Sequence, residues 1–306
     1  MGTPQAIVIA GPTASGKSAL ATTLAQRLGG VVINADSMQV YRELRILTAR
    51  PTPEDEALVP HRLYGHVAAA DPYSVGRYIT DVQRVLDDAR AAGLLPIIVG
   101  GTGLYLKALF DGLSPIPPVD PGVRSRWRQA AEGAEPGALH RALAERDREM
   151  GKRLAPGDTQ RIVRALEVVE STGRSLAAWQ AERGAPTLAF ESCACLVLAP
   201  PRPELYARVD ARFAAMVRAG AIDEVVRLAA LGLPDTLPAM RAVGVPLLLR
   251  HIAGDLPLAD AVALGQQDTR NYVKRQLTWL RRYMIAWKWS ESQFMETHAD
   301  AIGNLF

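Results

Sequence analysis

The segment from Ala6 to Leu28 constrains the fold most, because it joins an apolar run to a helix through a glycine-rich loop. Ala6-Ile7-Val8-Ile9-Ala10 predicts a buried strand, and the residues from Ser18 to Leu28 predict a helix. Such a loop surrounds an anion with backbone N–H groups at the positive end of the helix. The loop between them matches the whole G-x-x-x-x-G-K-[ST] pattern and reads Gly11-Pro12-Thr13-Ala14-Ser15-Gly16-Lys17-Ser18.

This phosphate loop predicts a polyphosphate ligand without saying whether the ligand is a nucleotide. The Lys17 ammonium can lie along the phosphates, and Ser18 offers a hydroxyl to a magnesium ion. A glycine-rich turn that only connects a strand to a helix is the alternative, but it does not require the complete motif in this setting.

Two further apolar runs extend the pattern of strands alternating with helices. Val31-Val32-Ile33-Asn34 and Pro96-Ile97-Ile98-Val99 predict buried strands, and Ser74 is a natural N-cap for a helix to about Ala92. A short strand is also expected at residues 62–67. The alternation predicts an α/β fold: a P-loop three-layer core with a parallel sheet.

Polar residues follow these strands at the edge of the sheet where ligands bind. Asp36 comes just after the second strand, where it can accept a proton or bind magnesium through water. Taken alone, an aspartate that caps a helix or a turn is the better interpretation. Gln39 beside it carries a two-sided amide that can pair with a base edge.

The end of the third strand argues against phosphoryl transfer. Kinases and NTPases usually place an acidic residue there to hold magnesium. Here Val99 runs into Gly100-Gly101-Thr102, which offers a hydroxyl and no carboxylate. We expect the glycines to let a ligand approach the backbone closely.

The organisation changes at Gly112, where a proline-rich connector begins and an arginine-rich helical region follows. Strand character returns at Cys195-Leu196-Val197. We therefore predict a helical insertion domain at residues 113–193, between core segments 1–112 and 194–306. The last core segment is expected to be mostly helical, with a basic final helix that reaches about Trp287.

Within the insertion, a helix that starts after Asp158 places Gln160, Arg161 and Arg164 on one face. Two arginines and a glutamine suit contacts with phosphates and bases, and a net charge of +3 permits an RNA partner. A solvated face on which Arg164 pairs with a nearby glutamate is as good an interpretation.

The final helix carries a similar signal. Arg270, Lys274, Arg281 and Lys288 follow one face beside an apolar stripe, and no acidic residue occurs between residues 270 and 290. This pattern is typical of a surface that contacts a phosphate backbone.

Composition narrows the setting of the protein. Cys193 and Cys195 are the two cysteines, and neither has nearby ligands for a metal, so we expect them to pack as apolar residues. The first residues lack the pattern of a secretory signal, and no apolar run is long enough to span a bilayer. We expect a cytoplasmic protein without a membrane partner.

Taken together in their order, the motifs make the chain resemble the bacterial tRNA dimethylallyltransferases, also called tRNA isopentenyltransferases. The resemblance spans nearly the whole chain. Besides the phosphate loop it rests on Ala35-Asp36-Ser37-Met38-Gln39-Val40-Tyr41-Arg42, Thr48-Ala49-Arg50-Pro51, Gly100-Gly101-Thr102-Gly103-Leu104-Tyr105, Gln160-Arg161-Ile162-Val163-Arg164-Ala165-Leu166-Glu167-Val168, Met240-Arg241-Ala242-Val243-Gly244 and Lys274-Arg275-Gln276-Leu277-Thr278-Trp279.

The resemblance implies a prenyl transfer. The phosphate loop would hold the diphosphate of dimethylallyl diphosphate with Mg2+ instead of ATP. The exocyclic N6 of the adenosine 3′-adjacent to the anticodon would attack the allylic carbon, with Asp36 as base and Lys17 and Thr102 as further catalytic groups. The family also implies a monomer that grips the anticodon stem-loop of the tRNA.

The same resemblance assigns binding residues. Arg212 is expected to help the loop hold the diphosphate. The residues expected to contact tRNA are Asp36, Ser37, Met38, Gln39, Thr102, Arg124, Gln160, Arg161, Ile162, Val163 and Arg164. The chain departs from the family's pattern at Leu47, which is usually glycine, and at Val245, which is usually tyrosine.

Three other functions remain open. A P-loop small-molecule kinase would consume ATP, and the missing acidic strand end opposes it. An adenylate isopentenyltransferase would prenylate free AMP and would not need the arginine-bearing insertion. An RNA-binding protein with a vestigial loop would not need Lys17, Ser18 and Asp36 intact.

Overall fold

The computed structural model describes residues 4–291, and the chain forms two compact units. The first unit comprises the chain up to Phe110 and from Thr187 onward, and the helical unit comprises Asp111–Pro186. Residues 187–193, which we assigned to the insertion, belong to the first unit. The reason is that the backbone N–H groups of Thr187 and Leu188 both donate to the carbonyl of Leu109 (2.9 and 3.0 Å).

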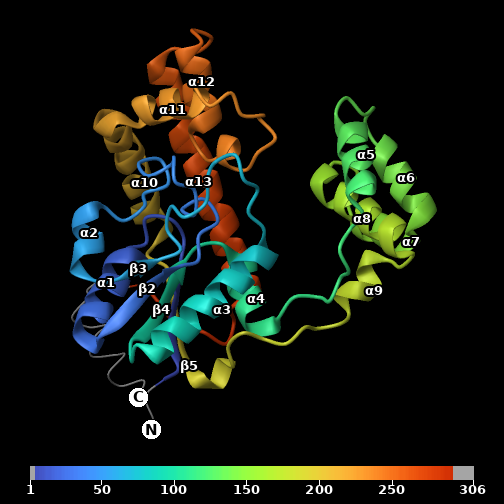
Figure 1. The fold of residues 1–306 in the computed structure, drawn as a ribbon. Helices are drawn as coiled ribbons and strands as arrows, with labels where there is room; N and C mark the ends of the chain where they lie inside the picture. Colours follow the sequence, from blue (N-terminus) through green and yellow to red (C-terminus); the bar gives the residue numbers. More distant parts are fainter. Residues whose placement is uncertain (1–3, 292–306) are drawn as a thin grey trace. The chain divides into compact units, whose positions relative to one another are not determined.

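A parallel six-stranded sheet forms the centre of the first unit (Figure 1). The strand order is β3-β2-β4-β1-β5-β6, and all the pairs are parallel. This confirms the predicted α/β fold with a parallel-sheet core. The strands are β1 (Ala6–Ala10), β2 (Gly30–Asn34), β3 (His61–Arg62), β4 (Leu95–Gly100), β5 (Cys193–Leu198) and β6 (Lys288–Ser290).

Strand β3 is shorter than the run of residues 62–67 that we expected, because Leu63 adopts a left-handed conformation (φ 62°) and ends the extended backbone. In the rest of that run, residues 63–67, the chain makes only an isolated β-bridge, between Val67 and Tyr41.

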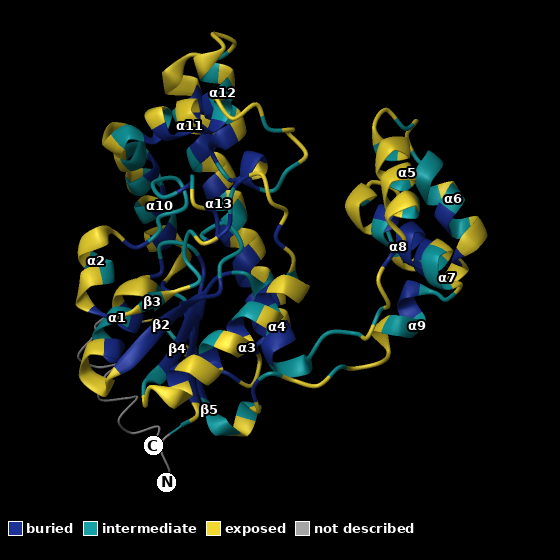
Figure 2. Cartoon of the chain, viewed as in Figure 1, coloured by how far each residue is buried: buried dark blue, intermediate teal, exposed yellow. Residues whose placement is uncertain are grey.

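Helices cover both faces of the sheet, as the alternation of side chains along each strand requires. Ala6 and Val8 of β1 face one apolar cluster, whereas Ile7 and Ile9 face another, which contains Leu20 and other residues of the first helix. Figure 2 shows the strands buried between helices whose outer faces are exposed. The helices of this unit are α1 (Lys17–Leu28), α2 (Pro53–Leu58), α3 (Val75–Ala91), α4 (Gly103–Asp111), α10 (Arg202–Met216), α11 (Ile222–Ala229), α12 (Val245–Ile252) and α13 (Leu258–Tyr283).

Helix α13 ends at Tyr283, four residues before the expected end at Trp287. Met284 and Trp287 are buried as predicted, but they lie in the turn that leads into β6, where Lys288 pairs beside Leu196. The spacing of buried residues therefore continues past the helix although the helical backbone does not.

The helical unit has its own apolar core, formed by residues such as Leu143, Ile162 and Leu166. A buried carboxylate, Asp147, organises one end of it by accepting hydrogen bonds from the Met150 N–H (3.1 Å) and from neighbouring donors. Its helices are α5 (Pro121–Ala131), α6 (Ala138–Arg146), α7 (Arg148–Arg153), α8 (Thr159–Thr172) and α9 (Leu176–Gln180). None of the helices described in either unit is long and apolar enough to cross a membrane.

Candidate active site

The phosphate loop connects β1 to α1 in a conformation that only certain residues adopt easily. Gly16 has a φ of 92°, which glycine adopts without steric cost, and Ala14 is held at φ 64° in the left-handed region. The Lys17 ammonium donates to the carbonyl of Pro12 (3.2 Å), so the side chain folds back over the loop. The loop is therefore already shaped around a position for an anion.

Two helices from the end of the chain fix this loop through one residue, Thr13. Its backbone N–H donates to Oε1 of Gln276 on α13 (2.9 Å), and its hydroxyl accepts a hydrogen bond from Arg212 on α10. Gln276 is buried, and its amide nitrogen donates in turn to the carbonyl of Gly101 (3.1 Å). Gln276 thus ties the phosphate loop to the end of β4.

The glycines at the end of β4 serve packing within the protein, which corrects our expectation that they admit a ligand. A Cβ on Gly100 would lie 2.1 Å from the carbonyl oxygen of Ala35, and a Cβ on Gly101 would lie 2.2 Å from the Gln276 amide nitrogen. A Cβ on Gly103 would collide with the ring of Trp279 (2.3 Å). Glycine is required here because β2 and α13 approach the backbone closely.

Asp36 lies where the sequence predicts, at the end of β2, and it also makes the turn contact of the alternative interpretation. Its Oδ1 accepts from the N–H of Met38 (2.9 Å), and its own N–H donates to the buried side chain of Asn34 (2.8 Å). Thr102 joins the same corner, since its hydroxyl accepts from the N–H of Ser37 (2.9 Å). The carboxylate is therefore oriented by its neighbours and only partly buried.

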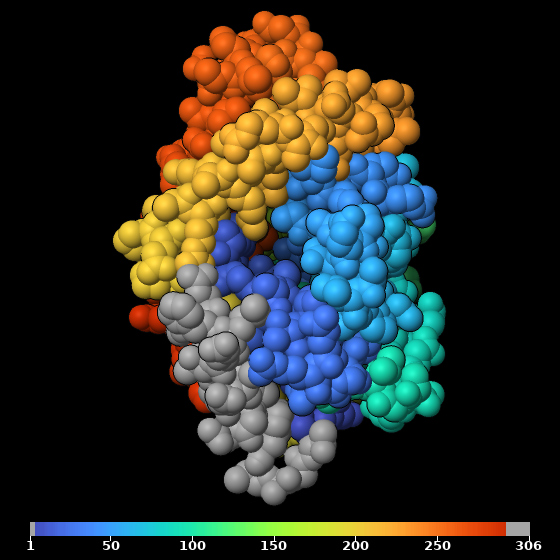
Figure 3. All heavy atoms as spheres, turned by 90° about the vertical axis from the view of Figure 1, so that its left-hand side faces the viewer, coloured from blue at the N-terminus to red at the C-terminus, as the bar shows by residue number. Residues whose placement is uncertain are grey.

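A cavity of about 440 Å³ is lined by the phosphate loop, by Asp36 and by Arg212. It opens as a hollow between α10 and the N-terminal segments (Figure 3). The structure thus brings together Lys17, Asp36 and Arg212, as we predicted from distant parts of the sequence. The full lining is Thr13, Ala14, Gly16, Lys17, Ser18, Ala19, Asp36, Gln39, Thr48, Ala49, Arg208 and Arg212.

The charges in this cavity act on one another. The pKa of Lys17 is lowered to about 8: burial is the main cause, the Asp36 carboxylate opposes it, and the nearby Arg212 adds to the lowering. Burial also lowers the pKa of Arg212, again against the influence of Asp36. Two cations held close together with one carboxylate leave the cavity suited to an added anion.

Three residues of the site carried no clear signal in the sequence. Arg208 lines the cavity one helical turn before Arg212, and Gln276 holds the loop from the far end of the chain. Tyr272 lies near Asp36: burial and the Asp36 charge raise the pKa of its hydroxyl, and a hydrogen bond with Thr102 opposes the rise. The one-turn spacing on α10 could have revealed Arg208. Gln276 lies in one of the motifs that carry the family resemblance, although that motif gave it no role, and no pattern marks Tyr272.

Gln39 already has hydrogen-bond partners within the protein. Its amide nitrogen donates to the backbone carbonyls of Thr48 (2.8 Å) and Ala49 (3.1 Å), which form part of the cavity wall. The amide nitrogen is therefore engaged by the cavity wall, and contact of Gln39 with a base stays a prediction.

In the helical unit, the predicted contact residues fall into two groups. Gln160 and Arg161 are exposed on α8, and Arg124 is exposed on α5. Ile162 is fully buried in the core of the unit and Val163 is 8% exposed, so their side chains pack inward, and their contact with tRNA stays a prediction. The helical period places these two residues on the face that packs inward.

Arg164 follows the structural alternative that the sequence left open. Its guanidinium lies 3.4 Å from Glu167, a buried carboxylate that Arg128 also contacts at 3.3 Å. Arg161 pairs with Asp158 at 3.0 Å but remains largely exposed. Of the two arginines, Arg161 is the more exposed, with 75% of its side chain accessible against 42% for Arg164.

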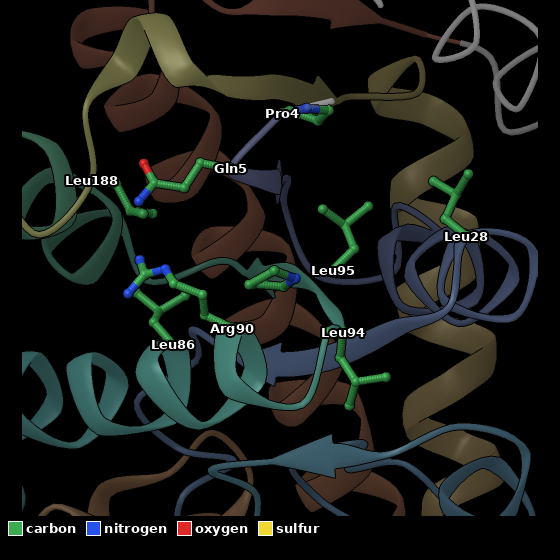
Figure 4. A pocket seen from close by; sticks show the side chains of 10 residues that line it. Pro4, Gln5, Leu28, Leu86, Arg90, Leu94, Leu95 and Leu188 are labelled. Atoms are coloured by element: carbon green, nitrogen blue, oxygen red, sulfur yellow. The ribbon is translucent and has the colours of Figure 1, made fainter. Parts of the chain in front are cut away.

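A second cavity, of about 570 Å³, lies at the opposite edge of the sheet (Figure 4). Its walls are mostly apolar and come from the end of α1, the end of α3 and the start of β4, with Leu28, Leu86 and Leu95 among them. Arg90 lies in the lining, and its guanidinium forms an ion pair with Asp87 (2.9 Å). This cavity brings no set of reactive groups together.

Metal binding by protein groups alone is not supported. Within residues 4–291, no cluster of three or more His, Cys, Asp or Glu side chains could hold a metal ion. Cys195 is buried and Cys193 is half-buried, and burial raises the pKa of both thiols, in keeping with packing.

The fold and the site define a P-loop α/β protein with a helical insertion, whose anion cavity contains one carboxylate. Residues 39–283 match the family model described as IPP transferase, and residues 4–65 match the model described as isopentenyl transferase. The first match covers most of the chain. The chain therefore belongs to the IPP transferase family, a family of prenyl-transferring enzymes.

Known relatives agree with this membership. A tRNA dimethylallyltransferase from Methylobacterium nodulans is 59% identical over 286 residues, which cover 93% of this chain and 94% of that protein. One from Bradyrhizobium sp. (strain ORS 278) is 55% identical, with coverage of 93% and 92%.

Solved structures share the architecture. The full-length tRNA isopentenylpyrophosphate transferase from Bacillus halodurans superposes with a TM-score of 0.68 at 31% identity, covering 98% of this chain and 96% of that one. A eukaryotic dimethylallyltransferase described as acting on tRNA gives 0.75 at 29% identity, covering 90% of this chain and 69% of that one.

Proposed function

We propose that this enzyme transfers the dimethylallyl group of dimethylallyl diphosphate to N6 of the adenosine 3′-adjacent to the anticodon of certain tRNAs, and releases diphosphate. The observation that carries the proposal is the placement of Asp36 in one cavity with the phosphate loop, Lys17 and Arg212. A base and a diphosphate grip must lie side by side for a nucleophile to be prenylated. Such an enzyme acts in the cytoplasm, where tRNA is available.

Asp36 supplies the base. An exocyclic adenine amine is a weak nucleophile, so its proton must leave as the new C–N bond forms. The hydrogen bond from the Met38 N–H engages Oδ1 and fixes the carboxylate, so Oδ2 is the oxygen that would accept the substrate proton. The allylic C–O bond breaks, and the diphosphate leaves with the electron pair.

The loop stabilises the leaving group. Lys17 and Arg212 provide positive charge, and the N–H groups at the start of α1 add donors toward the same space. Because both cations are partly removed from water, their attraction for a diphosphate is stronger than that of surface cations.

The donor set is also compatible with magnesium. Ser18 is exposed at the first turn of α1 and lines the cavity with Asp36. Magnesium in proteins commonly keeps several waters and binds through one or two protein oxygens plus substrate phosphates, which is what this site offers. When bound, the ion would neutralise charge on the diphosphate.

The acceptor requires a surface for a macromolecule. Exposed cations are available on α13, where Lys274 and Arg281 are exposed, and on α8 at Arg161. Arg270 is less available to a partner, because its guanidinium is paired with Asp210 at 2.6 Å and its side chain is only 25% exposed. Free AMP would have no use for cations spread over two units.

Incubation with labelled dimethylallyl diphosphate and either unmodified tRNA or AMP tests the proposal. Label should appear in an adenosine of the anticodon loop after nucleoside analysis, and not in AMP. Thermal unfolding provides an independent check, since dimethylallyl diphosphate should raise the transition temperature more than ATP does. Transfer to AMP alone, or stabilisation by ATP alone, would overturn it.

A further inference from the structure

We propose that Glu224, a buried carboxylate on α11, is a positioning residue that holds in place one wall of the cavity in which dimethylallyl diphosphate would bind. The inference rests on the proposed function of that cavity. Glu224 does not line the cavity and has no path to the reacting atoms. It acts through residues 45–49, which we call the wall loop.

One carboxylate satisfies three successive backbone donors of the wall loop. Glu224 Oε2 accepts from the N–H groups of Arg45 and Ile46 (2.7 Å each), and Oε1 accepts from the N–H of Leu47 (2.9 Å). The side chain is 3% exposed, so water cannot replace it readily. A negative charge inside a ring of N–H groups is a strong and specific clamp.

The clamp reaches the cavity through a short chain of contacts. Thr48 donates from its hydroxyl to the carbonyl of Leu44 (2.6 Å), and the N–H of Ala49 donates to the carbonyl of Ile46 (3.0 Å). Thr48 and Ala49 line the cavity, and their carbonyls accept from Gln39. The wall loop is thus held by Glu224 on one side and by Gln39 on the other.

The wall loop needs this support because its backbone is irregular and strained. Ala49 has a φ of 53°, a conformation that residues with a Cβ rarely adopt. Strained backbone persists only where surrounding contacts hold it. Removal of the hydrogen bonds to Glu224 should therefore let the wall loop move away from bound dimethylallyl diphosphate.

A local irregularity of the helix accounts for the reach of Glu224. Between α10 and α11 the chain makes a wide π-helical turn at Val217–Ala221, where Gly220 has a φ of 99°. This turn redirects α11, so that Val225 and Leu228 pack into the core while Glu224 meets the wall loop. The charged residue is placed by the fold and cannot be recognised from its own sequence neighbourhood.

The variant Glu224→Gln tests the role, because an amide puts donors against the N–H groups of the wall loop. The KM for dimethylallyl diphosphate should rise about tenfold. The KM for tRNA and kcat should stay within about twofold, since neither the base nor the tRNA surface changes. Asp223→Asn, an exposed neighbour on the same helix, is the matched control and should leave all three values unchanged.

Binding of inorganic diphosphate, measured by calorimetry, separates this inference from the proposed reaction. The affinity should fall in Glu224→Gln even if the wild-type enzyme proves to use another prenyl acceptor. If Glu224→Gln does not fold, Glu224→Asp keeps the charge at a shorter reach and should show the same change to a smaller degree. Unchanged diphosphate affinity in a folded variant, or equal rises in both KM values, would overturn the positioning role.

Discussion

At the scale of single residues, the site is organised by one carboxylate among cations. The Asp36 carboxylate raises the pKa of both Lys17 and Arg212 and so favours their charged forms. When no ligand is bound, the carboxylate serves as the counter-ion of both cations. A bound diphosphate would replace Asp36 as the counter-ion of the two cations. Donor binding would then free Asp36 to act as a base.

Replacement of Asp36 by asparagine should abolish most of the transfer but leave the fold and tRNA binding intact. Asparagine keeps an oxygen for the Met38 N–H but cannot take a proton, so kcat should fall by about 10² to 10⁴. Single-turnover assays and tRNA binding in filter or fluorescence experiments measure the two effects. An equal loss of tRNA affinity would mark Asp36 as a docking residue instead.

The lowered pKa of Lys17 predicts a loss of activity on the alkaline side. The cationic form dominates below about pH 8 in the ligand-free enzyme and is lost as the pH rises through that value. Because kcat/KM reports ionisations of the free enzyme, kcat/KM for the donor should decline above about pH 8. Lys17→Arg, which stays charged, should flatten the profile; a decline of the same shape in that variant would assign it to another group.

The same residues show what the sequence could and could not predict. The phosphate loop, Asp36 and Thr102 follow strands directly, so their position at the edge of the sheet could be inferred from local pattern. Gln276 and Glu224 act across 263 and 178 residues of chain, respectively, and only the packing of helices reveals their partners. Ile162 is a core residue within a stretch that the family motif assigns to tRNA contact, because a motif does not distinguish contact residues from the core residues between them.

At the scale of elements, one departure from the family's pattern, Leu47, lies beside the residue that precedes the other, Val245. A Cβ on Gly244, the residue before Val245, would lie 3.2 Å from Cδ2 of Leu47. Val245 is fully buried in the same apolar cluster against which Leu47 packs. We infer that the larger side chain at one position compensates for the smaller one at the other.

A double-mutant cycle measures this compensation. Leu47→Gly should destabilise the fold by loss of apolar contact, and Val245→Tyr by overpacking. The double variant should recover part of the loss, with a coupling energy of about 0.5–3 kcal/mol from urea unfolding. Additive changes in the free energy of unfolding would show that the two positions are independent.

The end of the last helix shows a limit of periodicity at this scale. Leu280, Met284 and Trp287 keep helical spacing, yet the backbone leaves the helix after Tyr283 and pairs beside β5. The rings of Phe110 and Trp287 pack edge to face, with their centroids 5.6 Å apart. The core therefore buries Trp287 although its backbone is no longer helical. Burial alone cannot distinguish a helix from the turn that follows it.

At the scale of the whole molecule, tRNA affinity should depend on cations from both units. Arg161→Ala should weaken tRNA binding and reduce the slope of log K against log salt by about 1. We choose Arg161 because removal of Arg164 would also leave the buried Glu167 with fewer partners. Arg90→Ala, at the opposite edge of the sheet, is the control, and an unchanged slope in Arg161→Ala would remove α8 from the contact surface.

The points at which the helical unit leaves and rejoins the first unit lie side by side. Leu109 contacts Thr187 and Leu188 directly, and within the helical unit Gly112 and Gly184 are so close that a Cβ on Gly112 would lie 2.4 Å from the carbonyl oxygen of Gly184. A unit whose two ends lie side by side can be removed or replaced without leaving a gap in the rest of the fold. We therefore expect that the helical unit can be exchanged, in evolution or by an engineer, without rebuilding the parallel-sheet unit that carries the cavity.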